Sequence, residues 1–154
     1  MKTVICVTMV FCLAFCLSAC GSAGAPVTSS QSTVAMPLSD CFTVSAEDQP
    51  ITGHLEFIDT PSDYMTYLSI EALGDLTDLS FYQVDWTEET YRIGQTLYTA
   101  PAIGTGQIFV AGITFWGDLT TYGVSCTDSA GVRHHYAIYL SGKDGSVITT
   151  PFTP

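Results

Sequence analysis

Apolar and polar residues alternate with a period of two over much of the chain after residue 40. The clearest example is residues 64–72, where Tyr64, Thr66, Leu68, Ile70 and Ala72 share one face of an extended chain. Side chains of a β-strand point alternately to the two sides of its sheet, so this pattern predicts a strand with one buried face. Because no long apolar repeat of 3.6 residues follows residue 40, helices are not expected there.

Short runs rich in Tyr, Phe, Val, Ile and Thr predict further strands, and Gly, Asp, Ser and Pro separate them. The predicted strands are residues 41–45, 54–58, 64–72, 79–86, 95–99, 107–113, 122–127, 133–140 and 146–149. Residues 128–131 and 142–145 contain the glycine and aspartate that tight hairpin turns require.

This spacing of short strands predicts an all-β fold, a single small antiparallel β-sandwich, with a small β-barrel as the alternative. The overall pattern resembles an immunoglobulin-like sandwich. Neither tryptophan, however, lies where the central Cys–Trp–Cys core of such domains would place it.

The first 19 residues differ from the rest of the chain. Lys2 is followed by an uncharged, apolar stretch that ends in small residues at 18 and 19. This is typical of a secretory signal peptide, with a membrane-spanning helix as the alternative. A spanning helix needs about 20 apolar residues and usually a basic segment after it, and neither condition is met.

The end of this leader, Leu17-Ser18-Ala19-Cys20, resembles the lipobox of bacterial lipoproteins. The resemblance implies cleavage before Cys20 and a diacylglycerol on its thiol, which would anchor the protein to a membrane on the extracytoplasmic side. Ordinary signal-peptidase cleavage after residues 23–25, Ala-Gly-Ala, is the alternative. It would leave Pro26 as the first residue, which such peptidases usually reject.

Three segments follow from these patterns. Residues 1–19 are the predicted signal peptide, and residues 20–37 are a lipidated cysteine with a flexible linker of small, uncharged residues. Residues 38–154 are the all-β globular domain, whose length suits one self-sufficient core.

Charge narrows the choice of partner. Residues 20–154 contain all fifteen acidic residues but only three basic ones, for a formal charge of −12. Such a chain repels phosphate backbones, so nucleic acid is not an expected partner. The acidity is also typical of a protein kept soluble by its charge.

Cysteine usage agrees with export. If Cys20 carries a lipid, only Cys41 and Cys126 remain in the domain. In an oxidising compartment these two allow a single disulfide, which would close a loop of 86 residues. Two buried free thiols are the alternative.

Two tryptophans are the candidate ligand-binding residues. Trp116 precedes a Gly-Asp turn at 117–118, where a sheet end would leave the ring accessible, and Trp86 lies beside acidic residues. Asp85 and Glu88 flank Trp86 closely enough to suggest acid–base chemistry on a glycan. The same residues also fit a turn in which Asp85 caps the following amides.

No metal site or cofactor is expected. His134 and His135 are adjacent in a predicted strand, so they should point to opposite faces, one exposed and one partly buried. The turn aspartates Asp75, Asp78 and Asp128 do not follow the spacing of a calcium-binding loop.

These observations favour a lipid-anchored, extracytoplasmic binding module without catalytic activity, acting on another protein or a wall polymer. One alternative is an acidic inhibitor of a basic enzyme such as lysozyme, since a net charge of −12 would steer a cationic target. The other is a small glycan-active enzyme that uses Asp85 and Glu88.

Overall fold

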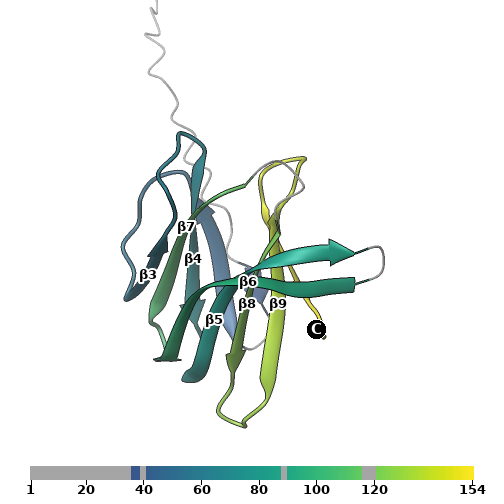
Figure 1. The fold of residues 1–154 in the computed structure, drawn as a ribbon. Helices are drawn as coiled ribbons and strands as arrows, with labels where there is room; N and C mark the ends of the chain where they lie inside the picture. The colour runs from purple at the N-terminus through teal and green to yellow at the C-terminus, as the bar shows by residue number, and fades with distance from the viewer. Residues whose placement is uncertain (1–35, 39–40, 88–89, 116–120) are drawn as a thin grey trace, which may run out of the picture. The chain divides into compact units, whose positions relative to one another are not determined.

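The protein folds as a two-layer β-sandwich (Figure 1). The computed structural model describes residues 36–38, 41–87, 90–115 and 121–154, all within one compact unit. These residues form two five-stranded sheets and include no helix. The predicted all-β sandwich is therefore confirmed, and the sheets do not close into the alternative barrel.

Sheet A has the strand order β1-β2-β4-β7-β3. Its strands are β1 (Met36–Leu38), β2 (Phe42–Glu47), β4 (Met65–Ala72), β7 (Ile108–Thr114) and β3 (Leu55–Ile58). All neighbouring strands are antiparallel except β3, which runs parallel to β7.

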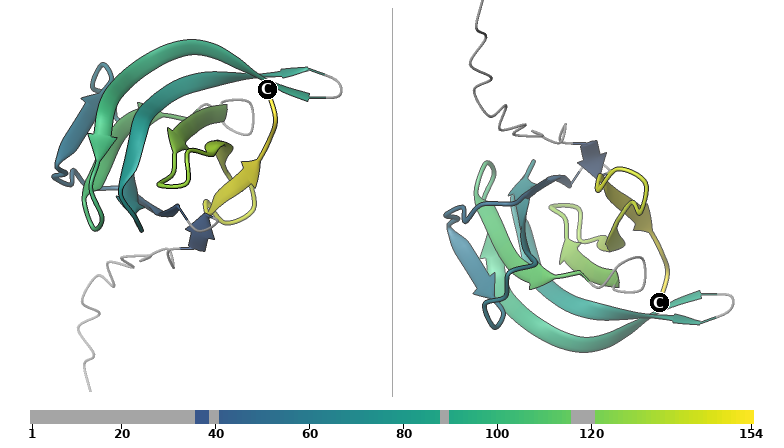
Figure 2. Two further views of the ribbon diagram at one scale, coloured as in Figure 1. Left: turned by 90° about the horizontal axis from the view of Figure 1, so that it is seen from below. Right: turned by 90° about the horizontal axis from the view of Figure 1, so that it is seen from above.

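Sheet B has the order β10-β9-β8-β5-β6 and is antiparallel throughout. Its strands are β10 (Val147–Pro151), β9 (Arg133–Leu140), β8 (Thr121–Thr127), β5 (Leu76–Thr87) and β6 (Thr90–Ile103). Figure 2 shows β5 and β6 as long, arched strands whose ends near residues 87 and 90 project beyond the sheet.

The connectivity is immunoglobulin-like. Strands β2, β4 and β7 occupy the A, B and E positions of one sheet, and β5, β8 and β9 occupy the C, F and G positions of the other. The D position beside the E strand is filled by β3, which comes earlier in the chain and is parallel to β7. Strand β6 lies beyond β5, where variable-type domains carry an added strand.

A buried tyrosine ties the two sheets together at the start of β8. The Tyr122 hydroxyl donates a hydrogen bond to the carbonyl oxygen of Thr114, the last residue of β7, at 3.1 Å. A tyrosine near the start of the F strand that bonds to upstream backbone is the tyrosine corner of immunoglobulin-like domains. The bond satisfies a hydroxyl group that burial has removed from water.

Phe81 of β5 occupies the centre of the core in place of a tryptophan. Its ring stacks on Tyr122 with centroids 5.5 Å apart, and it meets Phe109 of sheet A edge-on at 5.5 Å. Phe57 lies 6.0 Å away on its other side. Such aromatic pairs add to the free energy gained by burial alone. Phe81 therefore packs rings from both sheets into one aromatic cluster that stabilises the core.

Strand β5 buries two consecutive side chains on opposite faces. Phe81 fills the core and Tyr82 is buried on the outer face of sheet B, as the alternation of side chains along a strand requires. The register with β6 shifts between Phe81 and Tyr82 and again between Tyr82 and Val84. Bulges of this kind bend a strand and increase its twist, which accounts for the arch of β5 and β6.

The pairing of β1 with β2 starts at Met36, so it overlaps the last two residues of the segment 20–37. The strand predicted at residues 95–99 is too short, because β6 runs over Thr90–Ile103, and β5 starts at Leu76, before the predicted residue 79. Gly94 and Pro101 lie within β6, and an edge strand tolerates both because one of its sides is unpaired. The prediction for residues 133–140 is confirmed by β9.

Gly123 allows Tyr82 to lie flat against β8. A Cβ atom at this position would collide with the Tyr82 ring and with Val84. We expect Gly123→Ala to lower the free energy of unfolding by about 1–3 kcal/mol, because the tightly packed outer face has no room for a methyl group. Gly74→Ala is the matched control, since nothing lies within 4 Å of the added atom. Urea unfolding of both variants makes the comparison, and equal stabilities would contradict this account of the outer face.

Candidate functional site: an aromatic surface on sheet B

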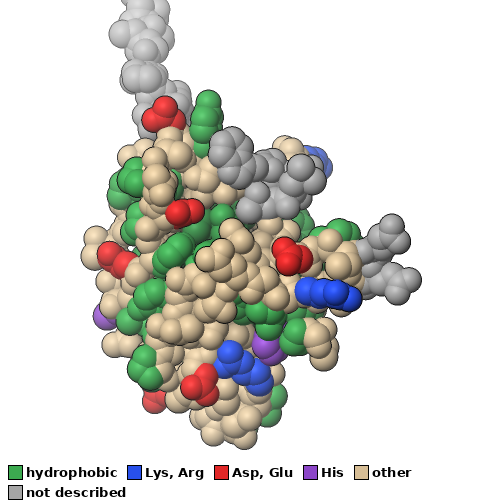
Figure 3. All heavy atoms as spheres, in the orientation of Figure 1, with side chains coloured by type: hydrophobic (Ala, Val, Ile, Leu, Met, Phe, Trp, Pro, Cys, Tyr) green, Lys and Arg blue, Asp and Glu red, His purple; other side chains and the backbone are tan. Residues whose placement is uncertain are grey.

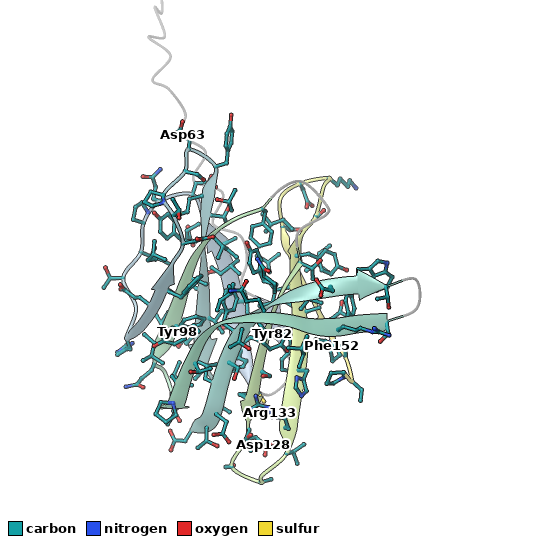
Figure 4. The ribbon with its side chains drawn as sticks, in the orientation of Figure 1. Asp63, Tyr82, Tyr98, Asp128, Arg133 and Phe152 are labelled. Atoms are coloured by element: carbon teal, nitrogen blue, oxygen red, sulfur yellow. The ribbon has the colours of Figure 1, made fainter. Side chains whose placement is uncertain are left out.

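Four rings form a continuous aromatic surface on the outer face of sheet B. They are Trp86 of β5, Tyr91 of β6, His135 of β9 and Phe152, which follows β10. Trp86 is 62% exposed at the projecting end of β5, and the other three rings are half-buried. Figure 4 shows Phe152 beneath the projecting ends of β5 and β6.

The rings contact one another in sequence. Trp86 and Tyr91 meet edge-on with centroids 4.7 Å apart, and Tyr91 lies 5.5 Å from Phe152. Phe152 lies 5.8 Å from the ring of His135. The successive planes are inclined by 54–62°, so the surface is faceted and not flat.

Backbone pairing holds these rings in place. Trp86 and Tyr91 are directly opposite in the β5–β6 ladder, where side chains on one face are close neighbours. The Phe152 amide donates to the His135 carbonyl oxygen at 3.0 Å, one residue after β10 ends. The aromatic surface is thus preorganised, which lowers the entropic cost of binding a ligand.

Tyr82 supports the inner end of the aromatic surface. Its hydroxyl lies 3.3 Å from Nδ1 of His135 and 3.5 Å from the carbonyl oxygen of Val124. Burial raises the pKa of Tyr82 to about 12, so the phenol stays protonated. Burial, followed by the positive charge of Arg133, lowers the pKa of His135. His135 is therefore neutral at pH 7, and its Nδ1 atom can accept a hydrogen bond from the Tyr82 hydroxyl.

Of the two tryptophans proposed to bind ligand, Trp86 belongs to this surface and Trp116 lies outside the described residues. The sequence analysis missed Tyr91, His135 and Phe152 as members of the site. One signal was available for Tyr91, because Trp86 and Tyr91 are each two residues from the Glu-Glu pair at 88–89 in the sequence. His135 and Phe152 join the site only through the folding of sheet B.

The acid–base pair proposed for glycan chemistry is not assembled by the described residues. Asp85 lies inside β5, so its predicted role as a turn cap is wrong. Its carboxylate points to the face opposite Trp86, since a Cβ atom on Gly94 would lie 3.3 Å from Asp85 Oδ2. Glu88 lies outside the described residues.

The two adjacent histidines point to opposite faces, as predicted. His134 Nε2 pairs with Asp128 Oδ2 at 2.8 Å on the inner side of sheet B, whereas His135 meets Phe152 on the outer side. The prediction that one is exposed is wrong, because both are half-buried. Within the described ranges, no three His, Cys, Asp or Glu side chains are grouped closely enough to hold a metal ion.

The turn aspartates bond to the protein itself. Asp128 accepts hydrogen bonds from the amides of Ala130 and Val132, both at 2.9 Å. Asp75 accepts from the Thr105 amide and hydroxyl, also at 2.9 Å. These bonds lower the pKa of Asp75, and the bonds from His134 and the turn amides lower that of Asp128. Both carboxylates are therefore charged at neutral pH.

Cys41 and Cys126 lie side by side between the sheets as free thiols. Cys41 immediately precedes β2, and Cys126 is in β8. Both side chains are buried in the same core cluster, and burial raises the pKa of Cys126 to about 12. The disulfide between them stays a prediction, and so does lipidation of Cys20, which lies outside the described residues.

Protonation of His135 should weaken the fold as the pH falls. Its folded-state pKa is below the unfolded value of about 6.5, so the unfolded chain takes up the proton first. We expect the contribution of His135 to the free energy of unfolding to be complete above that value and to be lost as the pH falls below it. In His135→Gln this decline should be smaller. Urea unfolding at each pH measures the effect, and identical pH profiles for the two proteins would refute it.

No protein-family profile, curated protein or solved structure matches this chain. Among the described residues, no helix has the length and apolar character needed to cross a membrane. The geometry of the aromatic surface is accordingly the basis for the function proposed below.

Proposed function

We propose that this protein is a lipid-anchored, extracytoplasmic binding module without catalytic activity, and that it recognises its ligand on the aromatic surface of sheet B. The ligand is another protein or a wall polymer. The observation that carries the proposal is the exposure of Trp86, 62% accessible at the outer edge of four rings in contact.

An exposed tryptophan held by its neighbours is well suited to binding. Most of the Trp86 ring is in water, so a ligand that covers it gains the hydrophobic free energy that folding has left unused. Little rotamer freedom is lost on binding, because Tyr91 already packs against the ring. Aromatic residues with these properties dominate the binding energy of many interfaces.

The immediate surroundings of the aromatic surface favour an uncharged ligand. On the strand pair that carries Trp86 and Tyr91, the side chains next along the same face are Val84 and Ile93. The carboxylate of Asp85 points to the opposite face, and His135 is neutral at pH 7. Among the described residues, a ligand therefore meets apolar rings and hydroxyl groups here, although the chain as a whole is strongly acidic.

The anchor complements this role. A lipid on Cys20 would hold the protein at the membrane, and the linker after it would let the domain reach a ligand in the wall or on a neighbouring protein. Two or more acyl chains give stable anchoring, whereas one gives marginal binding. The lipobox at residues 17–20 supports this part of the proposal.

The acidic-inhibitor alternative rests on net charge alone. The acidic side chains seen in Figure 3 are spread over that face and do not gather in one patch. A basic enzyme would need a complementary cluster to gain specificity. The aromatic surface gives the binding-module hypothesis a defined site, which the inhibitor hypothesis lacks.

Replacing Trp86 with alanine tests the site. We expect Trp86→Ala to weaken binding to isolated native cell wall or membrane protein by at least about tenfold, a typical loss for a central aromatic anchor. The fold should be unaffected because the side chain is mostly exposed. Co-sedimentation with wall polymer and quantitative pull-down of membrane proteins provide the two measurements.

Tyr64→Ala is the matched control. Tyr64 is also aromatic and 74% exposed, but it precedes β4 of sheet A and is not part of the aromatic surface. It should bind as the wild type does. If Trp86→Ala binds both preparations as tightly as Tyr64→Ala, the aromatic surface is not the binding site.

A further inference from the structure

Two buried cysteines, Cys41 and Cys126, lie in the core between the sheets. Cys41 immediately precedes β2, and its carbonyl oxygen accepts a hydrogen bond from the Leu73 amide at 2.8 Å. Cys126 lies in the middle sheet-B strand β8. His134, which is opposite Cys126 in the β8–β9 ladder, lines one cavity with Cys41, so the two cysteines come from different sheets to the same part of the core.

Both cysteines are buried, Cys41 with 4% and Cys126 with 0% of its surface exposed, but only Cys41 lies beside a cavity. A cavity of about 240 Å³ opens beside Cys41. The residues that line it are Cys41, Gly74, Asp75, Leu76, Asp128, Ser129 and His134. Cys126 is not among them and is completely buried. A small molecule that enters the cavity therefore meets the Cys41 side chain first.

The cavity also carries negative charge. Asp75 and Asp128 both line it, and hydrogen bonds to each lower their pKa values, so both are ionised at neutral pH. His134 pairs with Asp128 at 2.8 Å and offsets part of that charge only when it is protonated. Opposite charge attracts a ligand into such a site, and like charge repels it.

We propose that Cys41 is a thiol–disulfide exchange site, reached through this cavity by small disulfides of neutral or positive charge. The Cys41 thiolate attacks one sulfur of the incoming disulfide, forms a mixed disulfide and releases the first thiol. The Cys126 sulfur then attacks the Cys41 sulfur, its proton passes to the departing thiolate, and the second thiol is released. The two protein thiols are oxidised to one disulfide, and the incoming disulfide is reduced to two thiols.

This reaction would fasten sheet A to sheet B covalently across 84 intervening residues. Closing a loop of that length restricts the unfolded chain strongly, so the oxidised protein resists unfolding more than the reduced one. The inference is independent of the aromatic surface, which lies on the other face of sheet B.

Cystamine is a suitable probe because it is a small disulfide with two positive charges. The full-length protein is treated under native conditions, quenched in acid, digested and mapped by mass. In Cys126→Ser we expect a half-cystamine adduct on Cys41. In Cys41→Ser, Cys126 should react at least about tenfold more slowly, because it does not reach the cavity. In urea both cysteines should react at similar rates, which controls for intrinsic reactivity.

The wild type gives a second readout that needs no cysteine variant. We expect a transient adduct on Cys41 only, followed by a Cys41–Cys126 disulfide and a higher urea midpoint. An adduct that appears on Cys126 first, or equal native rates in the two serine variants, would overturn the assignment of Cys41 as the exchange site.

Charge selectivity tests the route through the cavity. Cystamine should react with Cys41 several-fold faster than oxidised glutathione, which is anionic, and added salt should reduce the difference. Asp128→Asn should also reduce it, since that change removes one of the two lining carboxylates. If the ratio of the two rates is the same in the wild type, in high salt and in Asp128→Asn, the disulfide does not enter through this cavity.

Discussion

The burial of β5 on both of its faces is the constraint on which the rest of the structure depends. Phe81 points into the core and the next residue, Tyr82, points to the outer face, because side chains alternate along a strand. Phe81 joins the two sheets through Tyr122 and Phe109. Tyr82 packs over Gly123, so the outer face of sheet B becomes a second packed layer.

The aromatic surface is continuous with that second layer through the contact between Tyr82 and His135. Tyr82 contacts His135, His135 contacts Phe152, and the rings continue through Tyr91 to the exposed Trp86. Exposure increases from the buried Tyr82, through the half-buried rings, to the exposed Trp86. The buried end therefore holds the rings rigidly, and the exposed end provides the accessible area. This gradient explains how the domain holds an exposed tryptophan in a fixed position.

The two sites use the opposite faces of sheet B for different chemistry. On the outer face, the described residues of the aromatic surface are rings that suit an uncharged ligand. On the inner face, Asp128, His134 and Cys41 line a polar cavity that reaches the junction of the sheets. The adjacent residues His134 and His135 divide between these sites because consecutive side chains of a strand point in opposite directions.

The sequence by itself determined the class of fold and much of its local structure. Alternation with a period of two predicted β4 and its buried face at Leu68, Ile70 and Ala72, and it predicted β9 with the correct bounds, because that signal is local. It also marked Trp86 as a candidate. Only the tertiary structure decided that Trp86 joins Tyr91, His135 and Phe152, that Asp85 turns away from it, and that Cys41 but not Cys126 lines a cavity. These outcomes depend on register shifts and on contacts between residues far apart in the chain, which no local pattern encodes.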